Sequence, residues 1–331
     1  MTKLNVTGLK QKAKSLGPGA DGTYAHIGAR GGTEMMMDGL RRYADRTLLE
    51  KFNIICSRVT GKLDPDKNHI LWLHDTWDDP ESQHLADDAS RKRFKKLVFV
   101  SNYQQATYNI GLSVPHSEGV VLPNAIDPIP KHDKPWMHEG KINLIYHTTP
   151  HRGLELLVPV VEHLVENGYP IHLDVYSSFS IYGWAQRDEP YKELFERIKA
   201  HPNMTYHGYQ PNDIVREALK KAHIYAYPNI WPETSAISVI EAMSAGCTVV
   251  CPNHAALPET TANFAAMYPF VENYNDHANR FASVLAEVVN GYWDEGNQNK
   301  MKFQKMYVDN FYSWDLRARQ WNSFLSSLVE K

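Results

Sequence analysis

Two glutamates eight positions apart, Glu233 and Glu241, occur in the stretch YPNIWPETSAISVIEAMSAGCTVVCPN. Pro232 and Ser235 predict that a helix begins near 234–235, between the two acids. The first backbone N–H groups of a helix lack intrahelical partners and lie at the positive end of its dipole. The start of this helix is therefore a candidate anion-binding site.

Glu241 lies about five residues into the predicted helix, roughly 8 Å along the axis, and its side chain leans back toward the helix start. Its carboxylate could accept hydrogen bonds from a diol beside the anion, as a ribose lies beside a diphosphate. Glu233 would then face the other end of the ligand. Alternatively, Glu233 is a first-turn acid favoured by the dipole and Glu241 is an exposed helix residue. An acid in the apolar run AISVIEAMSAG needs a partner, but spacing alone does not choose between the two.

Basic and glycine residues elsewhere complement these acids. Arg152, in YHTTPHRGLELL, is expected at the first turn of a helix, where the dipole disfavours a cation unless an anion is bound. A diphosphate would supply that anion, and a solvated arginine is the alternative. In GARGGTEMMMDGLRRYA, Gly31 and Gly32 lead into a helix, so backbone N–H groups could approach a ligand, although Gly-Gly is also an ordinary turn. No G-x-G-x-x-G follows a strand, which argues against a nicotinamide-dependent oxidoreductase.

The second half of the chain alternates strands and helices, which must position these groups. We expect strands at 142–147, 171–177, 204–208, 223–228 and 247–252, and helices at 153–168, 191–201, 212–222 and 235–246. Such alternation requires crossover connections and therefore predicts a doubly wound parallel sheet with helices on both faces. Ligands bind to such sheets at the carboxyl ends of the strands.

The first half is a sparser version of the same pattern, with expected strands at 52–59, 69–75, 96–101 and 119–124. A length of 331 residues favours two domains. The proline-rich segment 125–141 reads as the linker. We predict an N-terminal domain (1–130), a C-terminal ligand-binding domain (131–312) and a last helix (313–331), capped by Ser313, that packs across the junction. Residues 1–24 show no clear strand.

Composition limits the class of protein and its partners. Apolar residues are 43%, charged residues 22% and the net charge is −3. These values indicate a globular protein without a basic field for nucleic acid or acidic lipid. The three cysteines suggest core thiols in a reducing compartment, and Cys247 and Cys251 are poor metal ligands because they lie in an apolar run. No segment is apolar enough to span a bilayer, so a cytoplasmic protein is expected.

Taken together in order and spacing, these motifs resemble the retaining glycosyltransferases of the GT-B fold, family 4. The resemblance covers about 25–325 and is strongest over 142–260. It rests on Glu233…Glu241 with the following AMSAGCTVV and LPET, and on the Gly-Gly loop, LWLHD, VFVSNYQQ, VLPNAID, YHTTPHRGLELL, YHGY and YSWDLRARQW. It implies two Rossmann-like domains that face a cleft, with the N-terminal domain reduced.

The resemblance also implies roles for particular residues. Glu241 would hold the ribose of a nucleotide-diphosphate sugar, Glu233 the sugar hydroxyls, and Arg152 the diphosphate. His74 would contact the transferred sugar near the reacting carbon. The remaining donor contacts would come from Gly31, Gly32, Thr148, Gly208, Tyr209, Ser235, Ala236 and Ile237. The reaction would keep the anomeric configuration, and it would need neither metal nor cofactor. The acids Asp75, Asp78 and Asp79 are therefore expected to be solvated rather than metal-bound.

The sequence departs from the family pattern at several positions. His147 stands where a second arginine is usual, and Ala125 and Ala236 replace common glycines. The N-terminal half, where an acceptor such as a glycan or glycoprotein would bind, is short. Two other functions stay open at this point. One is a nucleotide-sugar epimerase or hydrolase on a related fold, and the other is a scaffold that binds nucleotide sugar without turnover.

Overall fold

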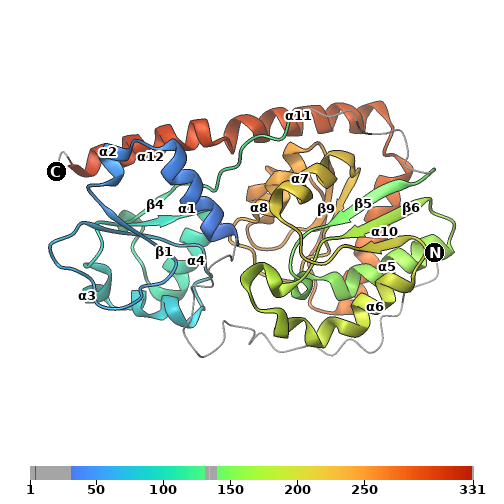
Figure 1. Cartoon of the computed structure of the whole chain (residues 1–331), viewed down its shortest axis with the longest axis horizontal. Coiled ribbons are helices and arrows are strands. Elements are labelled where there is room, and N and C mark those ends of the chain that lie inside the picture. The colour runs from blue at the N-terminus through green and yellow to red at the C-terminus, as the bar shows by residue number, and fades with distance from the viewer. Residues whose placement is uncertain (1–3, 5–30, 131–133, 135–139, 330–331) are drawn as a thin grey trace.

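The computed structural model describes residue 4, residues 31–130, residue 134 and residues 140–329, and all statements below concern these residues. Except for Leu4, residues 1–24, which the sequence left without a strand, lie outside them, as does part of the expected linker. The described chain forms two parallel sheets side by side, one of four strands and one of six, with helices around each (Figure 1). The predicted α/β fold with two parallel-sheet domains and a reduced N-terminal half is confirmed.

The N-terminal sheet has the order β1-β2-β3-β4. Its strands are β1 (Asn53–Cys56), β2 (His69–Trp72), β3 (Lys96–Phe99) and β4 (Gly119–Val121). Successive side chains alternate between the two faces. Ile70, Trp72 and Val98 pack in one core cluster, while Leu71, Leu97 and Phe99 pack in another. Both faces of this short sheet are therefore covered.

The C-terminal sheet has the order β10-β9-β8-β5-β6-β7. Its strands are β5 (Ile142–Tyr146), β6 (Ile171–Val175), β7 (Met204–Tyr206), β8 (Ile224–Ala226), β9 (Thr248–Pro252) and β10 (Ala266–Tyr268). The chain proceeds from β5 toward β7 on one side and from β8 toward β10 on the other. The strand order therefore reverses between β5 and β8, and ligands bind at such a switch point in open α/β sheets.

The helices begin and end within a few residues of the expected positions. In the N-terminal half they are α1 (Gly32–Tyr43), α2 (Arg46–Leu49), α3 (Asp88–Arg91) and α4 (Asn102–Leu112). The C-terminal half has α5 (Leu154–Glu166), α6 (Lys192–Ala200), α7 (Asn212–Lys221), α8 (Ile237–Ser244), α9 (Leu257–Thr260) and α10 (Tyr274–Asn290). The described helices include none that is long and apolar enough to cross a membrane.

Two long helices, α11 (Glu295–Phe311) and α12 (Trp314–Val329), run along one edge of the molecule from the C-terminal to the N-terminal domain (Figure 1). The hydroxyl of Ser313 accepts a hydrogen bond from the amide of Leu316 (3.2 Å), which confirms the predicted cap. Trp314 of α12 packs so closely on α1 that a Cβ at Gly39 would lie 2.0 Å from its ring. The last helix is thus part of the N-terminal core.

Candidate functional site

The loops that follow β5 and β8, residues 147–153 and 227–236, meet at the point where the strand order reverses. Gly153 has φ +125°, and a Cβ at this position would lie 2.2 Å from the carbonyl oxygen of Pro228. The amide of Ile230 donates to the carbonyl of Arg152 (3.3 Å). Only glycine permits this approach, which fixes the two loops against each other.

Arg152 and Glu233, one from each loop, form an ion pair. The hydroxyl of Tyr227 donates to the same carboxylate oxygen of Glu233, Oε1, at 2.5 Å. Burial alone lowers the pKa of Arg152, but Glu233 and Tyr227 outweigh burial, so the pKa is raised and the guanidinium stays charged. Burial raises the pKa of Tyr227, so this hydroxyl stays a donor. The second carboxylate oxygen, Oε2, is the one that can accept from a ligand.

Arg152 lies before its helix rather than in the first turn. It ends a short 3-10 helix, Pro150–Arg152, and Gly153 then separates it from α5. The predicted conflict between this cation and the dipole of α5 is therefore wrong. Glu233 supplies the counter-charge for Arg152.

Helix α8 begins at Ile237, two residues later than the sequence predicts. Ala236 precedes it, and its backbone lies in the left-handed region (φ 71°, ψ 77°), which residues other than glycine rarely adopt. Because this conformation is not helical, α8 can begin only at the next residue, Ile237. The first free amides of α8 are therefore those of Ile237 and Ser238, while Ser235 and Ala236 belong to the loop that carries Glu233.

Glu241 is buried inside α8, with 3% of its surface exposed, so the alternative of an exposed helix acid is wrong. Its carboxylate accepts hydrogen bonds from Arg216 (2.8 Å) and from Asn212 (3.1 Å) of α7. Burial raises the pKa of Glu241, and the two donors oppose this shift. Both partners were missed in the sequence, although their spacing of four residues places them on one face of α7.

The N-terminal domain contributes three of the expected residues. A Cβ at Gly32 would lie 3.0 Å from Cδ1 of Ile237, and one at Gly31 would lie 2.6 Å from Cε1 of Tyr182. The glycine loop thus faces the start of α8 across the domain boundary. His74 follows β2, and neither of its ring nitrogens makes a well-formed hydrogen bond with a described residue. Burial lowers the pKa of His74 to about 4, so the ring is neutral at pH 7.

Several polar atoms of loop 147–153 also lack a partner among the described residues. They are Nε2 of His147, the hydroxyl of Thr149, Nδ1 of His151 and Nε of Arg152. Buried polar groups are normally hydrogen-bonded, so such a cluster in one loop indicates a site that a polar ligand completes. Burial lowers the pKa of His147 to about 4. The backbone carbonyl of Thr148 accepts from Ser177 (2.7 Å), which anchors the loop.

The loop between β7 and α7 holds the remaining expected residues. Gly208 has φ +64°, and Tyr209 is 38% exposed. They precede Asn212, the partner of Glu241, so both lie in the segment that leads to this carboxylate. The donor contacts expected of Gly208 and Tyr209 stay a prediction.

The sequence suggested that the acids after β2 are solvated, but the structure shows that two of them form ion pairs. Arg58 pairs with Asp75 (3.5 Å) and with Asp79 (3.1 Å), while Asp78 is exposed. Within the described part of the chain, no group of three or more His, Cys, Asp or Glu residues is arranged to hold a metal ion. Cys247 and Cys251 are free and buried, and Cys56 is partly buried.

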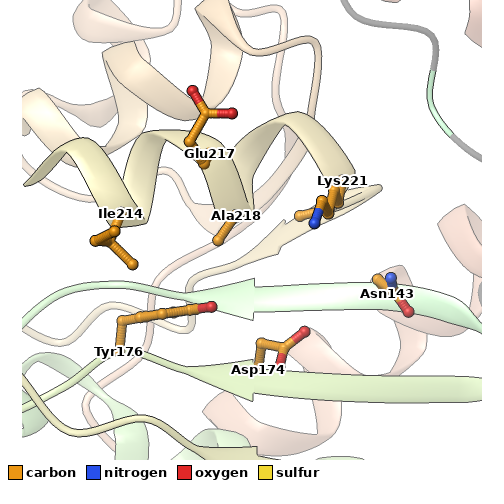
Figure 2. A pocket seen from close by; sticks show the side chains of 8 residues that line it. Asn143, Asp174, Tyr176, Ile214, Glu217, Ala218 and Lys221 are labelled. Atoms are coloured by element: carbon orange, nitrogen blue, oxygen red, sulfur yellow. The ribbon is translucent and has the colours of Figure 1, made fainter. Parts of the chain in front are cut away.

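A cavity of about 370 Å³ lies elsewhere, between α7 and the face of the sheet (Figure 2). Asp174 and Tyr176 of the β6 region and Asn143 of β5 form its floor, while Ile214 and Lys221 of α7 are among the residues that cover it. Neither Glu233 nor Glu241 lines this cavity. It is separate from the site at the switch point.

Comparison with protein families gives a match over residues 136–298 to the family described as Glycosyl transferases group 1. A curated relative, the O-antigen chain mannosyltransferase B of Escherichia coli, is 25% identical over 229 residues. The aligned part is 67% of this chain and 55% of the relative. The chain thus spans about half the length of the relative.

Solved structures share the fold. A glycosyltransferase from Rickettsia africae has a TM-score of 0.67 at 14% identity, with 93% of this chain and 84% of that chain covered. The HepE protein of Anabaena, in complex with UDP and glucose, has a TM-score of 0.62 at 14% identity, with 79% and 72% covered. A sucrose-phosphate synthase from Thermosynechococcus elongatus has a TM-score of 0.63 at 13% identity, with 80% and 68% covered.

Proposed function

We propose, from the premise that this GT-B chain belongs to the group 1 glycosyltransferases, that it moves a sugar from a nucleotide-diphosphate sugar to a glycan or glycoconjugate acceptor. The donor would bind where loops 147–153 and 227–236 meet. The acceptor would enter from the N-terminal domain. Three free cysteines fit a reducing compartment, so the proposal places the reaction in the cytoplasm.

The observation that carries the proposal is the set of groups gathered at the switch point from three separate segments. Arg152 supplies a permanent cation, Glu233 has an oxygen left for a hydroxyl, and Glu241 is a buried acid held by two donors. A guanidinium suits a diphosphate because it offers parallel N–H groups to phosphate oxygens. Carboxylates suit sugar and ribose hydroxyls. The combination supports a ligand with a diphosphate between two polyols.

In the proposed reaction, the bond between the anomeric carbon and the diphosphate oxygen breaks while an acceptor hydroxyl attacks that carbon. Arg152 and the first amides of α8 stabilise the negative charge that develops on the departing diphosphate, which is the main contribution of the protein. Neutral His74, which comes from the N-terminal domain, would donate a hydrogen bond to the transferred sugar or accept one from it. Retention of configuration follows if the acceptor proton passes to the leaving oxygen on the same face. The scheme assigns no step to a metal.

Calorimetric titration with UDP, GDP, ADP and TDP, on wild type and on Glu241→Ala, tests the donor site. Selective binding of one nucleotide that is lost in the variant is the expected result. The matching nucleotide sugars, UDP-glucose or GDP-mannose for example, then serve to measure turnover with and without glycan acceptors. No binding of any nucleotide would contradict the proposal. Donor turnover that no acceptor stimulates would favour the hydrolase or epimerase, and binding without any turnover would favour the scaffold.

A further inference from the structure

Hydrogen bonds cross the domain boundary close to His74 and Glu233. Helix α4 of the N-terminal domain begins after Ser101, whose hydroxyl caps the helix by accepting from the amide of Gln104 (3.0 Å). The same hydroxyl donates to the carbonyl of Thr234 in the C-terminal domain (2.6 Å). The start of α4 therefore rests against the loop that carries Glu233.

Glu259 of α9 places its carboxylate on the start of α4. Its Oε1 accepts from the backbone and side-chain amides of Asn102 (2.8 Å each), and its Oε2 accepts from the amide of Tyr103 (2.9 Å). A carboxylate at a helix N-terminus is favoured by the dipole and satisfies amides that have no partner within the helix. Here the acid comes from the opposite domain, more than 150 residues along the chain.

Thr234 makes the contact nearest to the reacting groups. Its hydroxyl donates to the backbone carbonyl of His74 (2.7 Å), and it directly follows Glu233 in the chain. A single residue thus ties the backbone of His74 to the backbone of Glu233.

The same contacts are connected to the helix that crosses between the domains. The carbonyl of Thr260, next to Glu259, accepts from the hydroxyl of Tyr312 (3.0 Å), at the junction of α11 and α12. The backbone amide of Trp314 donates to the backbone carbonyl of Ile126 (3.2 Å), where the chain leaves the N-terminal domain. Thr260, the neighbour of Glu259, is therefore bonded to the junction of α11 and α12.

We propose that Thr234 and Glu259 are positioning residues, which clasp the two domains so that His74 lies over the sugar held by Glu233. We call the six residues His74, Ser101, Asn102, Tyr103, Thr234 and Glu259 the domain clasp. The predicted effect of the clasp on turnover depends on the proposed function, whereas its predicted effect on domain closure is independent of that function. A clasp of a few hydrogen bonds can open to admit substrate and close again, as substrate-driven domain closure requires.

The test compares Glu259→Ala and Thr234→Val with Thr234→Ser, which keeps the hydroxyl. Glu287→Ala, at an exposed position of α10, is the matched control for loss of an acid. Three quantities are measured on the full chain: amide hydrogen exchange at Asn102 and Tyr103, the Kd for UDP and GDP, and kcat and KM with UDP-glucose and GDP-mannose.

For Glu259→Ala we expect exchange at the two amides to rise at least about tenfold, with the nucleotide Kd changed less than about twofold and kcat lowered about tenfold. Thr234→Val should lower kcat similarly, and Thr234→Ser should restore it. Unchanged exchange, or raised exchange with wild-type kcat, would overturn the clasp. If wild type binds and turns over no nucleotide sugar, the proposed function fails, while the exchange result still decides whether the clasp closes the domains.

Discussion

Arg152 and Glu233 are each other's counter-ion, although they come from loops that follow different strands and were expected to bind different parts of a ligand. With 21% and 7% of their side chains exposed, the two charges are largely shielded from water. Removal of one charge therefore leaves the other buried and unpaired. A substitution that removes either charge therefore has a cost in stability that must be separated from its cost in binding.

Arg152→Ala should lower the free energy of unfolding by about 3 kcal/mol, because Glu233 loses its counter-charge. Glu233→Gln in the same background should recover part of this loss. In calorimetry the variant should lose more affinity for UDP or GDP than for UMP or GMP, since the guanidinium is proposed to bind the diphosphate. Equal losses for the diphosphate and the monophosphate would show that Arg152 recognises another group.

Glu241→Ala should weaken nucleotide binding through loss of the ribose contact. Wild type should bind UDP or GDP more tightly than the 2′-deoxy analogue, by about tenfold, and the variant should bind both equally. Loss of Glu241 also frees Arg216, so Arg216→Met serves as the control for that effect. A melting loss without any change in binding would contradict the ribose role.

His74→Ala should lower kcat by about 100-fold with little change in nucleotide affinity, because the ring is proposed to contact the sugar rather than the nucleotide. His74→Gln, which keeps one donor and one acceptor, should retain more activity than alanine. Steady-state kinetics and titration with UDP or GDP separate the two effects. A variant that turns over at the wild-type rate would remove His74 from the reaction.

Stability should fall as pH drops below 6.5, and His147 is one of the buried histidines that contribute to this fall. Its pKa is about 4 in the folded protein, lowered by burial, and about 6.5 in the unfolded chain. Between these values the unfolded chain binds more protons, so the stabilisation is complete above pH 6.5 and is lost as pH falls toward 4. Urea unfolding from pH 7.5 to 4.5 should show a shallower slope for His147→Gln than for wild type. The exposed His116→Gln should match wild type, and an unchanged slope in His147→Gln would refute the assignment.

Ala236→Gly should stabilise the protein by about 1 kcal/mol, because glycine adopts the left-handed conformation of this position without strain. Ala245→Gly is the matched control, since Ala245, the C-cap of α8, is in the right-handed region (φ −71°, ψ −3°) and glycine there should destabilise. Thermal unfolding of both variants gives the comparison. A lower melting temperature for Ala236→Gly would indicate that its methyl group contributes packing that outweighs the strain.

The sequence predicted the sheets well because hydrophobic periodicity and alternation of strands and helices are local patterns. Strands β5 and β9, for example, lie within the apolar runs that predicted them. It also selected Arg152 and Glu233, which form an ion pair, and His74, whose backbone carbonyl accepts a hydrogen bond from Thr234, the neighbour of Glu233.

The partners of these residues were not predictable in the same way. Whether Arg152 pairs with Glu233, and Glu241 with Arg216, depends on how loops and helices pack, which no local spacing encodes. The start of α8 was placed too early because the N-cap signals are local, while the left-handed conformation of Ala236 is imposed by its surroundings. The contact between Glu259 and α4 is likewise visible only once both domains are placed.

The packing of α12 determines the order in which the protein can mature on the ribosome. Trp321 and Leu325 lie in the same core cluster as Leu40 and Trp72, so this N-terminal core needs residues made almost 250 positions after Trp72. The strands of the N-terminal domain are therefore synthesised first, but its core is complete only after α12 has been made. During translation its incomplete core exposes apolar surface until α12 is made, and exposed surface of this kind makes a nascent chain prone to aggregate.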